Sequence, residues 1–98
     1  MSEQMQSFAS LFPLGHTLAT PGALEALEEA HMSPLVLLSR HSQGDWGDLC
    51  DADRQENERA LKRGGRLFSA YNIGAKVRVW IITESDRSAT TLLLPLEY

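Results

Sequence analysis

The spacing of apolar residues changes from a helical period to a strand period at Arg66, and no other feature of the sequence constrains the fold as strongly. Beyond this point apolar and polar residues alternate in three segments, which are 66–71, 75–84 and 89–94. Turn-forming residues at 72–74 and 85–88 separate these segments, so we expect an antiparallel meander of three strands. The second turn places Ile81 opposite Leu92, on the face that forms the core.

Helix-start signals precede this region. Thr20-Pro21 and Ser33-Pro34 each combine an N-cap residue with a proline at the first helical position, which predicts two short helices, the second ending near His41. A third helix is expected at 51–63, because acids begin the segment, bases end it and two glycines follow. The predicted fold is therefore α+β, a three-stranded antiparallel meander with about three short helices on one face. A fourth strand at 15–19 is the alternative.

Length and composition indicate one domain. The 98 residues, of which 43% are hydrophobic, suffice for a single modest core spanning 1–98, and the polar residues 1–7 are expected to be flexible. No apolar run approaches the roughly 20 residues needed to cross a bilayer, and the first residues lack a signal-peptide pattern. The single cysteine, Cys50, cannot form an internal disulfide. We therefore expect a cytoplasmic protein that does not interact with membranes.

Charge is distributed unevenly along the chain. Residues 45–58 contain six acids and one base, whereas residues 59–78 contain six bases and no acid. One interpretation is a solvated helix whose charges suit its dipole. The other is a pair of charged surfaces that recognise a partner. The partner-binding candidates on this second interpretation are Asp45, Trp46, Asp48, Asp51, Glu56, Lys76, Arg78 and Trp80.

The two tryptophans have different expected settings. Trp46 lies between glycines, either as a plug over the core or as an exposed anchor. Trp80 falls on the strand face opposite the core, where it would form an uncovered apolar patch with Ile82, Leu93 and Leu67. Such patches are typical of partner or homo-oligomer interfaces. In the alternative, the N-terminal residues Phe8, Leu11 and Phe12 fold back over the patch.

A group of polar residues suggests a second hypothesis. His41, Asp53 and Asn57 fall at a helix end and on the inner stripe of the next helix. They form either a buried polar clasp or a small hydrolase or ligand-binding site with His41 as base. A Cys50 nucleophile paired with His41 is a further alternative. The cysteine and histidine spacings match no metal site and no cofactor-binding motif occurs, so neither a metal nor a cofactor is predicted.

Nucleic-acid binding is a third hypothesis. Lys76, Arg78 and Trp80 alternate onto one strand face, which could hold a single strand by charge and stacking. The pI of about 5.2 and the acid Glu84 on the same face disfavour this interpretation. Conversely, the acidic residues 45–58 could compete with nucleic acid for a basic site on a partner.

Three segments carry a family resemblance. They are ATPGAL at 19–24, GDWGDL at 44–49 and WIITESDRSATT at 80–91. Through these the chain, from about residue 12 to 98, resembles a group of small proteobacterial proteins encoded on plasmids and integrated mobile elements, some labelled plasmid-related protein. The resemblance implies a mobile-element setting and no particular activity. It favours, as the leading hypothesis, a non-enzymatic accessory protein that binds a protein partner and modulates or inhibits a host defence or nucleic-acid-processing complex.

Overall fold

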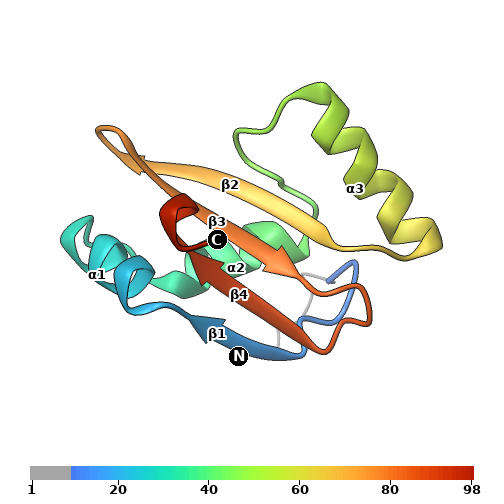
Figure 1. The fold of residues 1–98 in the computed structure, drawn as a ribbon, viewed down its shortest axis with the longest axis horizontal. Helices are drawn as coiled ribbons and strands as arrows, with labels where there is room; N and C mark the ends of the chain where they lie inside the picture. Colours follow the sequence, from blue (N-terminus) through green and yellow to red (C-terminus); the bar gives the residue numbers. More distant parts are fainter. Residues whose placement is uncertain (1–9) are drawn as a thin grey trace, which may run out of the picture.

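The computed structural model, which describes residues 10–98, contains a mixed four-stranded sheet (Figure 1). Its strands are β1 (His16–Ala19), β2 (Leu67–Gly74), β3 (Val77–Thr83) and β4 (Ala89–Leu93), arranged in the order β1-β4-β3-β2. The predicted antiparallel meander is confirmed in β2, β3 and β4, and Ile81 lies opposite Leu92 as expected. The fourth strand is also present, because β1 pairs in parallel with β4. The fold is α+β.

The helices begin where the capping signals predict. They are α1 (Pro21–Glu29), α2 (Pro34–Ser42) and α3 (Asp51–Arg63), with a short 3-10 helix, η2, at Pro95–Glu97. The Thr20 hydroxyl accepts a hydrogen bond from the Ala23 amide, and the Ser33 hydroxyl accepts one from the Leu35 amide, each at 3.1 Å. These caps satisfy amides that have no partner within the helix.

The main core lies between the sheet and the first two helices. α1 and α2 run beneath one face of the sheet (Figure 1). Their inward residues pack against side chains of β2, β3 and β4, in a cluster formed by Ala23, Leu27, Leu37, Leu38, Tyr71, Val79, Ile81 and Leu92. Removing this apolar surface from water stabilises the arrangement of α1 and α2 under the meander.

The third helix lies alongside the sheet, next to the edge strand β2 (Figure 1). Here the Asn57 side-chain amide donates to the Phe68 carbonyl at 2.7 Å and accepts from the Phe68 amide at 3.0 Å. Further along the same edge, the Ala70 amide donates to the Trp46 carbonyl at 3.2 Å, and the Ala70 carbonyl accepts from the Asp48 amide at 2.6 Å. The edge of β2 is therefore covered along much of its length, which removes a template for pairing with another chain.

Trp46 belongs to a second, smaller core. Its indole is only 2% exposed, and the cluster around it contains Phe12, Ala60 and Leu67. The indole Nε1 donates a hydrogen bond to Glu58 at 3.2 Å. Because Trp46 fills the space between α3 and the sheet, its prediction as a partner-binding residue is wrong, and its interpretation as a plug is correct.

The first hairpin turn differs from the expectation. β2 continues to Gly74, and the turn consists of Ala75 and Lys76, with Lys76 at a φ of 63°. A register irregularity between Asn72 and Gly74 absorbs the extra residue. Lys76 therefore lies in a turn and does not share a strand face with Arg78, contrary to the prediction.

The expected cover of the Trp80 face also differs. Phe12 packs edge-to-face against His41, with ring centroids 5.2 Å apart, and so lies on the helix-covered side of the sheet. Leu11 is exposed, and Phe8 lies outside the described residues. Leu67 is fully buried in the small core and is not part of the Trp80 patch. Tyr98 packs against Trp80 instead, with ring centroids 5.7 Å apart.

Candidate functional site

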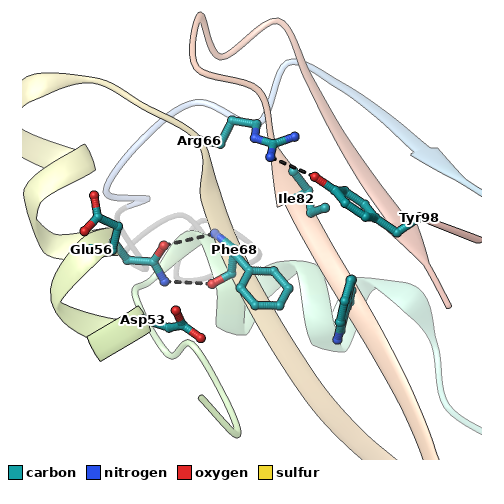
Figure 2. A pocket seen from close by; sticks show the side chains of 8 residues that line it. Asp53, Glu56, Arg66, Phe68, Ile82 and Tyr98 are labelled. Carbon is teal, nitrogen blue, oxygen red and sulfur yellow. Dashed lines mark hydrogen bonds between the residues drawn. The ribbon is translucent and has the colours of Figure 1, made fainter. Parts of the chain in front are cut away.

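A pocket of about 300 Å³ opens between α3 and the sheet face that α1 and α2 leave uncovered (Figure 2). We call this pocket and its rim the α3 groove. It is lined by Asp53, Glu56, Asn57, Arg66, Phe68, Trp80, Ile82 and Tyr98. The volume is at the lower end of the range for small-molecule sites and also suits one large side chain of a partner.

The floor of the α3 groove is a product of strand register. Phe68 lies opposite Ile82, and Trp80 lies opposite Ala70, so the large side chains project from the same face of β2 and β3. The Phe68 and Trp80 rings meet edge-to-face, with centroids 5.0 Å apart and planes at 86°. Together with Tyr98 they make an aromatic floor and wall, which favours an apolar or cationic occupant.

The rim beside the C-terminal segment combines a cation with a phenol. The Arg66 guanidinium donates to the Tyr98 hydroxyl at 2.8 Å and lies 5.8 Å from the centre of the same ring. This hydrogen bond raises the pKa of Arg66, whose side chain is exposed. Figure 2 shows the two side chains meeting at the edge of the pocket, above Ile82. Arg66 thus holds Tyr98 beside Trp80.

The opposite rim comes from α3. Asn57 is buried and directs its amide at the Phe68 backbone, so the helix is held at a fixed distance from the edge of β2. Asp53 and Glu56 are exposed, one on each side of this attachment. In Figure 2 the Asp53 carboxylate faces the side of the Phe68 ring, whereas that of Glu56 points away. Glu56 is paired instead with Arg59, at 2.6 Å.

One polar atom at the floor lacks a partner. The indole Nε1 of Trp80 is buried and makes no hydrogen bond to any residue in 10–98. A buried N–H without an acceptor costs about 1–3 kcal/mol, and native proteins retain few of them. This unsatisfied donor distinguishes Trp80 from Trp46, whose N–H donates to Glu58.

The acidic segment 45–58 is divided by the fold. Asp45 pairs with Arg40 at 2.7 Å, and this bond holds the pKa of Asp45 below its usual range. Asp48 accepts from the Asn72 amide at 3.0 Å, on the edge of β2. Both carboxylates therefore serve the fold, although they stay partly exposed, while the exposed Asp51 lies on the first turn of α3, outside the pocket lining.

His41, Asp53 and Asn57 do not converge, so the predicted hydrolase site around them is wrong. His41 is fully buried beneath the helix-covered face, Asn57 is bonded to the backbone of β2, and Asp53 is exposed in the α3 groove. Helix α3 lies beside the sheet and not over it, which keeps its polar residues away from the imidazole. Cys50 is exposed, so it does not form a pair with the buried His41 either.

His41 belongs to a buried hydrogen-bond chain. The Thr90 hydroxyl donates to the Leu14 carbonyl at 2.7 Å, so it accepts from the Thr83 hydroxyl, also at 2.7 Å. Thr83 in turn accepts from the His41 Nε2–H at 2.9 Å, and the Nδ1 accepts from the Ser69 hydroxyl at 2.5 Å. This arrangement requires a neutral imidazole. Burial agrees, since it lowers the pKa of His41 to about 4.

The predicted basic strand face is reduced to Arg78. Its guanidinium donates to the Asn72 side chain across the hairpin at 3.1 Å, on the same sheet face as Trp80. With Lys76 in the turn, the three residues do not form the row that single-strand binding would need. In the part of the chain that the structure describes, no cluster of three histidine, cysteine or acidic side chains could hold a metal ion.

Arg66, Phe68 and Tyr98 line the α3 groove but were not among the sequence candidates. The strand alternation already contains a signal for Phe68, because it shares the side-chain parity that pairs with Ile82. Tyr98 has no comparable signal, since it lies beyond the last strand, after Pro95. Between residues 10 and 98 no helix is long and apolar enough to cross a bilayer.

Comparisons with known proteins add no relative. No family model matches the chain, and no curated protein and no solved structure matches it either.

Proposed function

We propose that this protein acts by binding a protein partner through the α3 groove. The observation that carries the proposal is the position of the groove, where the acidic N-terminal half of α3 meets an aromatic sheet face. The acidic segment and the Trp80 face are the two surfaces for which the sequence favours a partner. Asp53 and Glu56 come from the first and Trp80 from the second, so both border one pocket.

The chemistry of the lining supports binding over catalysis. The pocket combines three aromatic rings and one aliphatic side chain with charged groups at its rim. Aromatic side chains clustered in a pocket are typical of the residues that dominate protein interfaces.

The biological setting is a separate part of the proposal. From the family resemblance we propose that the protein is a cytoplasmic mobile-element accessory protein whose partner belongs to a host defence or nucleic-acid-processing complex. Binding through the exposed charges at the rim of the groove would weaken as salt rises, since such charges are screened. The identity of the captured protein tests this setting.

The test is capture of the partner from the native host with matched baits. Tagged wild-type protein is compared with Trp80→Ala, which removes one of the two aromatic side chains of the groove floor. The control is Leu35→Ala, which removes an exposed leucine of α2. Thermal melts confirm that each bait is folded. We expect one protein to be retained by wild type and Leu35→Ala and lost by a folded Trp80→Ala. Its equal capture by all three baits would contradict the proposal.

Direct titration completes this test. The captured partner is purified and added to each variant, and the affinity is measured by calorimetry. We expect Trp80→Ala to weaken binding at least tenfold, as for central aromatic contacts in interfaces. If instead an oligonucleotide binds with the same dependence on Trp80 and the partner does not, the nucleic-acid hypothesis replaces this one.

A further inference from the structure

We infer that the α3 groove takes an arginine side chain of the partner, with Asp53 as its counter-charge and Trp80 and Phe68 as its apolar seat. This inference rests on the proposed function and adds the chemistry of the group that is recognised. Two observations support the inference. Some charged groups at the rim already have partners and one does not, and the aromatic floor between them has a definite shape.

Asp53 is the charged group at the rim that lacks a partner. Glu56 is paired with Arg59, and Arg66 donates to Tyr98. The Asp53 carboxylate makes neither a side-chain hydrogen bond nor an ion pair with any residue in 10–98, and in Figure 2 it faces the side of the Phe68 ring. A cation that enters the groove therefore finds one uncommitted carboxylate beside the aromatic floor.

The floor favours a cation with an apolar stem. A purely apolar occupant would cover Asp53 without a counter-charge, and an anion would be repelled by it. The Phe68 and Trp80 rings are nearly perpendicular and their centroids lie 5.0 Å apart, so the floor offers both an aromatic face and an aromatic edge. Cations are attracted to aromatic faces, and methylene groups pack on the remaining apolar surface.

Among protein cations the guanidinium fits best. It is planar, stacks on aromatic rings and is less strongly hydrated than the ammonium of lysine, so partial burial beside Trp80 costs it less. It also presents paired N–H groups, which match the two oxygens of the Asp53 carboxylate. Arg66, on the far rim, is exposed and directed at Tyr98, so it leaves the side next to α3 to the incoming group.

The experiment uses small side-chain analogues and the full-length protein. N-acetyl-arginine amide is titrated at millimolar concentration while NMR records the indole N–H signals, and Trp46→Phe assigns the signal of Trp80. The neutral isostere N-acetyl-citrulline amide and the cationic N-acetyl-lysine amide are titrated in parallel. We expect arginine to shift the Trp80 signal, with an affinity about 3-fold to 5-fold above that of citrulline and above that of lysine.

Matched variants assign the effect to Asp53. We expect Asp53→Asn to reduce the affinity for the arginine analogue to that of citrulline. Glu28→Gln, which neutralises an exposed acid on α1 outside the pocket lining, should leave it unchanged. Equal affinities for arginine and citrulline, tighter binding of lysine, or full affinity in Asp53→Asn would each overturn the inference.

The experiments distinguish failure of the arginine inference from failure of the proposed function. If N-acetyl-leucine amide shifts the Trp80 signal as strongly as the arginine analogue does, the groove binds apolar anchors and only the arginine inference is wrong. If no analogue shifts the signal, the inference is also overturned. The proposed function is then judged by partner capture with the Trp80→Ala bait.

Discussion

The side chain of Asn57 and the backbone of Phe68 form a two-hydrogen-bond bridge that joins helix α3 to the edge of the sheet. At Phe68 this side-chain amide takes the place of a neighbouring strand, while residues 46–48 pair with the same edge at Ala70. The bridge also sets the distance between Asp53 and the aromatic floor, because Asp53 lies one helical turn before Asn57 on α3. The attachment that protects the sheet edge therefore also shapes the α3 groove.

This bridge predicts a large effect of a small substitution. Asn57→Ala leaves the Phe68 amide and carbonyl without partners beside a buried helix face, so we expect a loss of about 2–3 kcal/mol in the free energy of unfolding. Chemical denaturation measures the loss. Gln55→Ala removes an exposed amide from the same helix and should change stability by less than about 0.5 kcal/mol. Similar effects of the two substitutions would refute the role of the bridge.

The buried His41 predicts that stability depends on pH. In the unfolded chain the imidazole has its ordinary pKa of 6.5, whereas burial in the folded protein lowers the pKa to about 4. Between these values the unfolded state binds a proton that the folded state does not, so stability decreases as the pH falls through this range. The decrease attributable to His41 is on the order of 3 kcal/mol.

Denaturation curves recorded from pH 7.5 to pH 4 check this dependence. The variant His41→Gln should be less stable at neutral pH, since its side chain cannot reproduce both bonds of the imidazole. Its stability should be nearly independent of pH between about 6.5 and 5, above the range in which carboxylates such as Asp45 become protonated. His31→Asn, at an exposed histidine, should retain the wild-type slope. An unchanged slope in His41→Gln would show that other groups cause it.

We expect that position 47 tolerates no residue other than glycine. Its φ is +78°, and a Cβ there would lie 2.2 Å from the Ala70 carbonyl, with which this segment pairs. We expect Gly47→Ala to separate residues 46–48 from β2 and to cost at least about 3 kcal/mol. Gly74→Ala is the control, because no atom lies within 4 Å of its added Cβ. Thermal melts that place both variants close to wild type would contradict this prediction.

The backbone conformation of His31 indicates a substitution that should stabilise the fold. It follows α1 with a φ of 56°, and the bonds from its amide to Glu28 and from the Met32 amide to Leu27 form a Schellman motif. Glycine adopts this left-handed conformation without the steric cost that a side chain carries. We expect His31→Gly to raise the free energy of unfolding by about 0.5–1 kcal/mol, with His31→Asn between it and wild type. A decrease in denaturant midpoint for His31→Gly would contradict the prediction.

Much of the secondary structure could be predicted because its causes are local. Thr20 and Ser33 followed by proline determine where α1 and α2 begin, and the two-residue alternation around Ile81 determines the meander. The first turn was misplaced because Gly74 suggested a turn residue, while the chain turns at Ala75 and Lys76. The irregularity after Asn72 shifts the pairing of β2 with β3, and no pattern in the sequence predicts this shift.

The candidate site was only partly predictable, because its residues come from distant parts of the chain. Trp80 and the acids of α3 could be selected by type and charge. Their adjacency required the Asn57 bridge, and the aromatic wall required Tyr98 to return to the sheet. In the same way, the sequence shows that His41 and Asn57 are polar residues on inner helix faces. It does not show that they lie in two separate parts of the fold.

Local sequence patterns specify the capping sites, the strand alternation and the division of charge, because each depends on neighbours a few residues apart. The tertiary structure alone decided that β1 pairs with β4, that Trp46 is buried and that Asp53 faces Phe68. These relationships depend on which backbone groups and apolar surfaces meet after the chain collapses. Their free energy comes from burial and long-range hydrogen bonds, which no local pattern specifies.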